Sequence, residues 1–283
     1  MADVPSTQGH RNAPPMAVAA AGAEFAYREY GPQGGVPLIA LTHLGANLDS
    51  WDPRIVEGLA EERHVIAVGY RGVGHSTGPV RESIEGMAED MAAVIRALGY
   101  DRVDVFGLSM GGMVAQAIAA QAPELIDRLI LAGSGPAGGP RLTDMTRITI
   151  TAAFQAVITF NDPKALLFFT RTPAGKTAAR EYLARLEGRT AGRDKPVTPK
   201  VYRAQLAAVH RWGLQQPAGL SHVTGPVLIV HGDRDRMVPA ANAAALTRQL
   251  PTASVTIFPD SGHGAVFQNH HAFVEAARDF LRR

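Results

Sequence analysis

A single serine between glycines is the first residue whose setting indicates chemistry. Residues 107–111 read Gly-Leu-Ser-Met-Gly, which places glycines two positions before and two after Ser109. A short apolar run precedes the serine and a helix-forming run follows it, as in a strand-to-helix turn tight enough to strain the serine backbone. Glycine is needed at both flanking positions because a Cβ there would collide with neighbouring chain. Such a turn exposes the hydroxyl and directs the first helical N–H groups at the atom it attacks.

Serine is a weak nucleophile at neutral pH, so it needs a base within hydrogen-bond reach and a partner that orients the base. Two later loops contain residues of these types. Asp235 follows the apolar run 226–230, and His263 follows the run 254–258. In an open parallel sheet, the loops at the carboxyl ends of the strands converge on one edge. We therefore expect Ser109, Asp235 and His263 to lie together.

Other acidic residues compete for the place beside His263. Asp233 lies in the same loop as Asp235, but the Gly-x-x-Asp spacing of residues 232–235 and the Val-Pro pair at 238–239 favour Asp235. Asp260 is very near His263 in sequence, and we interpret it as a structural residue. The loop after the run 129–132 contains no acidic residue, which also favours Asp235.

The composition is that of a soluble globular protein. Of the 283 residues, 46% are hydrophobic and 19% are charged, which is typical of folded domains. The formal charge of +2 is too small to indicate a nucleic-acid partner. The absence of cysteine removes disulfides, thiolate metal sites and thiol nucleophiles. No apolar run is long enough to span a bilayer, so we expect no membrane association.

We expect neither a metal nor a nucleotide cofactor. None of the histidines has metal-ligand spacing with another histidine and a carboxylate, and no Gly-x-Gly-x-x-Gly segment or P-loop is present. Residues 1–15 are polar and proline-containing, which predicts a disordered tail. Residues 16–23 are alanine-rich but short and lack a compact basic region directly before them, so we expect no secretion signal and a cytoplasmic protein.

Strand and helix signals alternate along most of the chain. This rhythm predicts an α/β fold with a mostly parallel sheet covered by helices on both faces. The strands are expected at 23–30, 37–42, 64–69, 103–108, 129–132, 226–230 and 254–258. The helices that cover the sheet are expected at 55–62, 81–98, 114–122, 240–250 and 271–282.

The alternation stops between residues 136 and 220, where helical segments occur without a clear buried strand. Candidate helices are 143–160, 163–171, 177–187 and 199–212. We interpret 136–220 as a helical cap inserted into a core formed by 16–135 and 221–283. Basic residues dominate the second half of the cap, and we interpret them as a solvated face in preference to an anion site. Phe154, Phe168 and Phe169 either form the core of the cap or face the sheet, where they would favour an apolar substrate.

Five short motifs together resemble the α/β-hydrolase fold. They are Thr-His-Leu-Gly at 42–45, Tyr-Arg-Gly-Val-Gly-His-Ser at 70–76, the turn at 107–111, Gly-x-x-Asp-x-x-Val-Pro at 232–239, and Ser-Gly-His at 261–263. Each motif is modest alone, but the five occur in the order that this fold requires, with the order serine, aspartate, histidine. The likeness runs from about residue 23 to the C-terminus. Residues 43–53, which include Trp51, and 133–139 more narrowly resemble bacterial esterases and non-haem haloperoxidase-like perhydrolases.

The resemblance implies a role for each matching residue. Ser109 is the nucleophile, His263 the general base and then the acid, and Asp235 orients His263. The oxyanion hole uses the Met110 N–H and a second N–H from Leu44 or Gly45, since the usual His-Gly-x is here His-Leu-Gly at 43–45. Trp51, Phe154, Phe168 and Phe169 are candidates for the substrate wall. Glycine at position 69, where the family commonly has an acid, removes a structural hydrogen bond.

The chemistry implied is attack of Ser109 on a carbonyl carbon of a small-molecule substrate. Hydrolysis of a carboxylic ester or a lactone is the first choice, and peracid formation is a variation on the same groups. Hydrolysis of a C–C bond in a β-diketone-like substrate uses the same three residues and remains an alternative. A small-molecule receptor on the same fold is a further alternative from a different class. Haloalkane dehalogenase and epoxide hydrolase chemistry is excluded, because both need a carboxylate nucleophile where this chain has Ser109.

Overall fold

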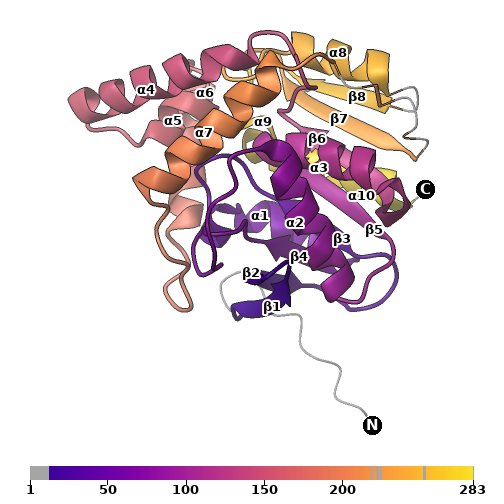
Figure 1. Ribbon diagram of the computed structural model, residues 1–283. Helices are drawn as coiled ribbons and strands as arrows, with labels where there is room; N and C mark the ends of the chain where they lie inside the picture. Colours follow the sequence, from indigo (N-terminus) through magenta and orange to yellow (C-terminus); the bar gives the residue numbers. More distant parts are fainter. Residues whose placement is uncertain (1–12, 218, 221–222, 224, 251–252, 283) are drawn as a thin grey trace.

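One mixed sheet organises the chain (Figure 1). The computed structural model describes residues 13–217, 219–220, 223, 225–250 and 253–282. Within these residues an eight-stranded sheet has the strand order β1-β2-β4-β3-β5-β6-β7-β8. Its strands are β1 (Met16–Ala20), β2 (Ala23–Tyr30), β3 (Leu38–Leu41), β4 (Val65–Val68), β5 (Val103–Leu108), β6 (Ile126–Ala132), β7 (Val227–Gly232) and β8 (Ala253–Phe258).

Strand direction divides the sheet into two parts. From β4 through β3, β5, β6 and β7 to β8, every neighbouring pair is parallel. At the other edge, β1 pairs antiparallel with β2, and β2 pairs antiparallel with β4. Strands β3 and β4 are the short apolar runs Leu-Ile-Ala-Leu and Val-Ile-Ala-Val, and all of their residues are buried. Such runs are expected where helices cover both faces of a sheet, so the predicted mostly parallel α/β sheet is confirmed.

Helices cover both faces of this sheet. Helix α2 (Ile84–Ala97) packs against α3 (Met110–Gln121) in front of the sheet in Figure 1, while α1 (Pro53–Ala60) packs against α10 (His270–Arg282) behind it. Helix α8 (Ala241–Gln249) contacts β7 and β8, and the short α9 (Ala265–Gln268) contacts α10. The 3₁₀ turns are η1 (Leu48–Ser50), η2 (Pro123–Leu125) and η3 (Leu142–Asp144). No helix of the described chain is both long and apolar enough to cross a bilayer.

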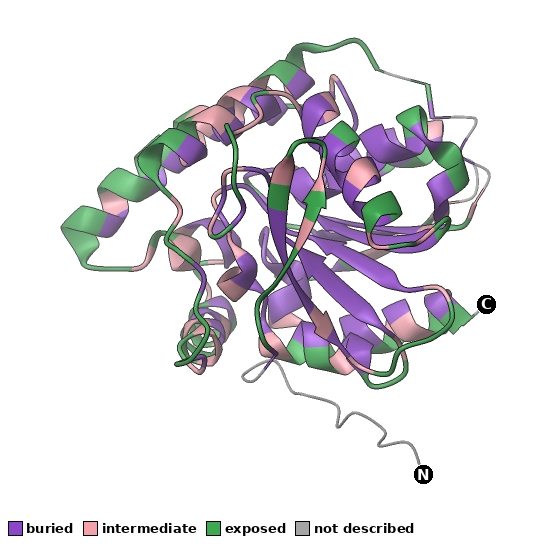
Figure 2. Cartoon of the chain, turned by 60° about the horizontal axis from the view of Figure 1, so that its bottom comes forward, coloured by how far each residue is buried: buried purple, intermediate pink, exposed green. Residues whose placement is uncertain are grey.

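The predicted cap segment forms four helices between β6 and β7. These are α4 (Met145–Thr159), α5 (Pro163–Phe168), α6 (Pro173–Leu186) and α7 (Pro199–Leu214), which lie together to the left of the sheet in Figure 1. Three of them begin with proline behind an Asp or Thr whose side chain accepts a backbone N–H, a strong helix-start signal. Figure 2 shows the central strands buried along their length, whereas the cap helices carry many exposed residues.

Buried ion pairs attach the cap to the core. The Arg185 guanidinium of α6 makes a two-point contact with the fully buried carboxylate of Asp52, with N–O distances of 3.0 and 2.7 Å. Arg28 of β2, itself fully buried, pairs with Asp49 at 2.7 Å and donates to the Gly192 carbonyl at 2.8 Å. The sequence predicts a solvated face for the basic residues of the cap. For Arg185 this is wrong, because its charge is paired at the cap–core contact.

The N-terminal segment also differs from the prediction. Residues 1–12 of the predicted tail lie outside the described residues, but Ala13 is fully buried and its carbonyl accepts hydrogen bonds from Arg189. Strand β1 occupies residues for which the sequence predicts no structure. It joins β2 through Ala21 and Gly22, whose φ values of 47° and 75° suit a tight hairpin turn.

Candidate active site

The turn between β5 and α3 holds Ser109 in a strained backbone conformation. Its φ and ψ are 57° and −116°, and its N–H donates to the Ala132 carbonyl of β6 at 2.8 Å. A Cβ on Gly107 would collide with the Gly111 backbone, and a Cβ on Gly111 would collide with the carbonyl oxygen of Leu41 in β3. The two glycines therefore allow α3 to start directly against the sheet, as their spacing predicts.

Three side chains from separate strand ends form one hydrogen-bonded chain. The Nε2 atom of His263 lies 2.8 Å from the Ser109 Oγ, and its Nδ1 atom lies 2.7 Å from the Asp235 Oδ2. All three residues are buried. Ser109 follows β5, Asp235 follows β7 and His263 follows β8. The structure thus brings together the three residues that the sequence predicts to meet.

Backbone groups orient the Asp235 carboxylate. Its Oδ1 accepts the N–H groups of Met237 and Val238, each at 2.9 Å, which leaves Oδ2 to face His263. A carboxylate only accepts hydrogen bonds, so the His263 Nδ1 carries the proton of this pair. In the neutral ring Nε2 is then the acceptor, and the Ser109 hydroxyl donates to it. This is the tautomer a general base requires.

The competing acids are occupied elsewhere. Asp233 is exposed, and its Oδ1 accepts the Ser261 N–H at 3.1 Å. The Oδ2 of Asp260 accepts the hydroxyl of Thr172 at 2.8 Å. In the described structure neither carboxylate is bonded to His263.

Of the two candidate donors in the loop after β3, one is already bonded. The Gly45 N–H donates to the Gln205 Oε1 at 2.8 Å, so it is already engaged. Within the described residues the Leu44 N–H has no such partner, and Leu44 lines the same cavity as Ser109. Met110 is the first residue of α3, where a helix leaves its N–H groups without an intrahelical acceptor. Of the two candidates for the second donor, the geometry favours Leu44.

Gln205 is a positioning residue that the sequence prediction misses. It lies on α7 of the cap and is fully buried, yet its amide reaches the loop after β3. Gly45 itself has a φ of 70°, and a Cβ there would meet the Tyr202 ring of the same helix at about 2.5 Å. A signal was present, because Gln205 interrupts the buried apolar face of α7 at helical spacing, and a buried amide must find a partner.

His43 lies beside Ser109 and His263 and is held neutral. Its Nδ1–H donates to the Leu44 carbonyl at 2.8 Å, and its ring is almost completely buried. Burial lowers the pKa of His43 to about 4. Burial also lowers the pKa of His231, whose Nε2–H donates to the Val238 carbonyl behind the Asp235 loop at 2.7 Å.

A cavity of about 230 Å³ opens onto the Ser109 hydroxyl. Of the predicted wall residues, Phe168 does line it, with its ring 5.0 Å from His43 and 5.7 Å from His263. Residues that the sequence prediction misses complete most of the wall. They come from α5 and its start, from α7 and from the Asp235 loop, namely Asp162, Pro163, Lys164, Leu167, Tyr202 and Met237.

The structure places the other three predicted wall residues away from this cavity. Trp51 is fully buried in the core, with its ring 5.4 Å from that of Phe106 under the sheet. Phe154 is 68% exposed on the outer face of α4. Phe169 is buried against Tyr182 inside the cap, with a ring separation of 5.5 Å. For Trp51 and Phe154 the prediction of a wall residue is wrong, because an aromatic side chain can point to either side of its element. For Phe169 the structure agrees with the other alternative, the core of the cap.

Comparisons with known proteins agree on one family. The family model described as the alpha/beta hydrolase fold matches residues 36–270. A solved structure of an alpha/beta hydrolase fold protein from Chitinophaga pinensis is 32% identical, with a TM-score of 0.92 over 97% of this chain and 99% of that one.

Two curated relatives carry specific names. A pimeloyl-[acyl-carrier protein] methyl ester esterase of Nitrosomonas europaea is 29% identical over 85% of this chain and 93% of its own length. A putative carbamate hydrolase of Agrobacterium fabrum is 26% identical over 87% of this chain and 93% of its own length.

The depressed pKa of His43 predicts a pH-dependent stability. Between about pH 6.5 and pH 4 the unfolded chain binds a proton at this ring that the folded chain does not bind. The free energy of unfolding should therefore fall as the pH is lowered through this range, by about 3 kcal/mol for His43 alone. Urea unfolding of the native chain and of His43→Asn across pH 4–8 isolates this contribution as the difference of two curves. Parallel curves would show that His43 does not titrate in this way.

Proposed function

The chain belongs to the alpha/beta hydrolase fold family, and from that membership we propose that it is a serine hydrolase. The proposed reaction is hydrolysis of a carboxylic ester or a lactone through an acyl-enzyme on Ser109. The observation that carries the proposal is the continuous chain from the Ser109 hydroxyl through His263 to Asp235, at 2.8 and 2.7 Å.

In the first step the Ser109 oxygen attacks the carbonyl carbon while the His263 Nε2 takes the hydroxyl proton. The imidazolium that forms lies against the Asp235 carboxylate, which stabilises its charge and holds its orientation. His263 then gives the proton to the departing alkoxide, which leaves Ser109 acylated. Water enters, His263 takes its proton, and hydrolysis releases the acid and restores the serine.

Negative charge develops on the carbonyl oxygen in both steps. We assign its stabilisation to the N–H groups of Met110 and Leu44, since Gly45 already donates to Gln205. The start of α3 adds a favourable dipole at the same point. Because Gln205 holds the neighbouring amide, the cap helps to set the position of the Leu44 donor.

The cavity favours a substrate that is small and largely apolar beside the reacting bond. Its volume of about 230 Å³ is modest, and its wall includes Leu44, Leu167, Phe168 and Met237. The two named relatives act, by their names, on an ester and on a carbamate. Both groups present a carbonyl carbon with a heteroatom leaving group, which fits attack by Ser109.

The first test is covalent labelling of the nucleophile. A fluorophosphonate probe should label the native chain and fail to label Ser109→Ala, because only the activated hydroxyl reacts. The native chain should also turn over p-nitrophenyl butyrate many times, and Ser109→Ala should lose at least 10³-fold in kcat. Turnover that survives in Ser109→Ala would reject the mechanism. Tight binding of an apolar ligand without labelling would instead indicate a receptor, and selective cleavage of β-diketones a C–C hydrolase.

The second test separates the two acids of one loop. Asp235→Asn should lower kcat by roughly 10³- to 10⁴-fold, because it removes the acceptor that fixes the His263 tautomer. Asp233→Asn is the matched control and should stay within about twofold, since its carboxylate is exposed and bonded only to the Ser261 N–H. Equal losses in steady-state kinetics would show that the acid is assigned to the wrong residue.

The third test concerns the oxyanion loop. Gln205→Leu keeps the apolar bulk of the side chain but releases the Gly45 N–H, so the Leu44 donor loses its fixed position. We expect kcat to fall about tenfold with little change in KM, a smaller loss than the roughly 10²- to 10³-fold for a missing donor. Arg203→Leu, an exposed change on the same helix, is the control. A rise in KM at constant kcat would assign Gln205 to substrate binding instead.

A further inference from the structure

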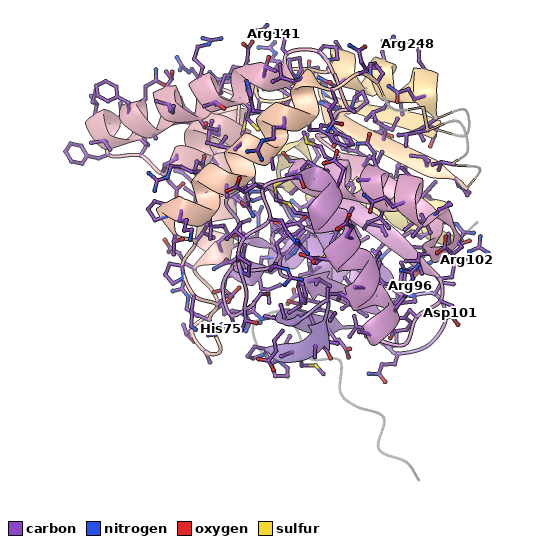
Figure 3. All side chains as sticks on the ribbon, viewed as in Figure 1. His75, Arg96, Asp101, Arg102, Arg141 and Arg248 are labelled. Carbon is purple, nitrogen blue, oxygen red and sulfur yellow. The ribbon has the colours of Figure 1, made fainter. Side chains whose placement is uncertain are left out.

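A second cavity, of about 370 Å³, lies beside the first between α4, α5 and the loop that carries Asp235. Four arginines from four different places in the chain line it. They are Arg141 before η3, Arg147 on α4, Arg171 after α5, and Arg236 next to Asp235. Figure 3 labels Arg141 at the edge of the cap. No part of the reaction proposed for Ser109 uses these four side chains.

These guanidinium groups carry more positive charge than their surroundings neutralise. Arg141 is bonded to Asp144 at 2.9 Å, and Arg147 lies 3.8 Å from the same carboxylate. Within the described part of the chain, Asp144 is the only carboxylate within 4 Å of the four groups. The Asp235 residue also borders the cavity, but its carboxylate is fully buried and bonded to Met237, Val238 and His263.

The other two arginines are bonded to neutral oxygens. Arg171 donates to the Gln155 side-chain oxygen at 3.5 Å, a weak contact, and Arg236 donates to the Leu166 carbonyl at 2.6 Å. Both therefore keep N–H donors for a ligand. Guanidinium groups bind carboxylates and phosphates through two parallel hydrogen bonds, and an anion among several like charges also relieves their mutual repulsion.

The arginine cavity adjoins the catalytic cavity. Leu167 of α5 lines both of them. The loop after β7 also separates them, because Asp235 and Arg236 border the arginine cavity while Met237 borders the catalytic one. The two cavities therefore share the Leu167 side chain as a wall, and a substrate that reaches both must pass it.

We propose that the arginine cavity binds an anionic group, a carboxylate or a phosphate monoester, at the far end of the substrate hydrolysed at Ser109. The inference rests on the proposed function. It refines the substrate class to an ester or lactone that is apolar beside the reacting carbonyl and anionic at its other end. The sequence favours a solvated face over an anion site for the basic residues of the cap. Arg171 is exposed as predicted, and the proposal adds an anion-binding role to it.

Matched ester pairs test the proposal. Mono-p-nitrophenyl adipate, suberate and sebacate end in a carboxylate, and p-nitrophenyl hexanoate, octanoate and decanoate are their partners of equal acyl length that end in a methyl group. Butyrate esters of 6-hydroxyhexanoate and of hexanol form the pair with the charge on the alcohol side. In at least one pair we expect kcat/KM to be tenfold or more higher for the anionic member. Sodium chloride at 0.5 M should reduce this preference.

The variant with Arg147→Ala and Arg171→Ala tests the named residues, because neither side chain holds a backbone carbonyl as Arg236 does. The ratio of kcat/KM for the anionic and neutral members should fall at least fivefold, and the double lysine variant should recover part of it. Arg248→Ala, an exposed arginine on α8 labelled in Figure 3, is the control. A variant that folds poorly loses both members of a pair alike, so the ratio stays a valid readout.

Three results would overturn the inference. They are no anionic preference in any pair, a preference that the double alanine variant keeps, and a loss of preference in Arg248→Ala of the same size.

Turnover measured with added inorganic phosphate distinguishes binding of a free anion from binding of a substrate group. If phosphate changes the turnover of both members equally and no pair shows a preference, the cavity serves a free anion. Failure of the proposed function is distinct, because the neutral esters would then show no turnover dependent on Ser109.

Discussion

The backbone at Ser109 has a positive φ of 57° that costs a residue with a Cβ roughly 1–3 kcal/mol, and the surrounding chain holds it there. The Ser109 N–H is tied to β6, and Gly111 lets the first turn of α3 touch the Leu41 carbonyl of β3. Because α3 is buried over most of its length, the helix cannot move away to relieve the strain. This turn fixes where the hydroxyl and the Met110 N–H point, and the Asp235 and His263 side chains are placed around it.

The parallel strands bring Asp235 and His263 to Ser109 through short loops. The loops after β7 and β8 reach the same edge of the sheet as the turn after β5, so Asp235 and His263 arrive at Ser109 without any long connection. Within the acid loop, two consecutive backbone N–H groups fix one carboxylate oxygen and leave the other for His263. Each member of the chain thus has its orientation set by a different element, which limits how far one local motion can disturb it.

The same logic explains what the sequence could predict. The sequence predicts that Ser109, Asp235 and His263 meet, because each follows an apolar run and the carboxyl ends of parallel strands share one edge of the sheet. The residues that line the cavity could not be predicted from the sequence, because the direction of each side chain depends on how its helix or strand packs. Trp51 turns into the core beside Phe106, and Phe154 turns outward on α4. The sequence does not predict strand β1, because its alanine-rich sequence has weak strand preference. Contacts with distant parts of the chain stabilise it, namely pairing with β2 and packing against α2.

Directional charged contacts are part of what attaches the cap to the core. Two-point pairs such as Arg185 with Asp52 are sensitive to angle as well as distance, whereas apolar contacts allow sliding. Burying such charges adds little net stability, and apolar contacts such as the stack of Tyr182 on Phe267 also join the cap to the core. On α7, Gln205 reaches from the cap to the loop after β3, and in the proposed mechanism small displacements of a donor in that loop lower the rate strongly. Two different cap helices thus make polar contacts with the core, α6 through the Arg185–Asp52 ion pair and α7 through the Gln205 amide that holds the loop after β3.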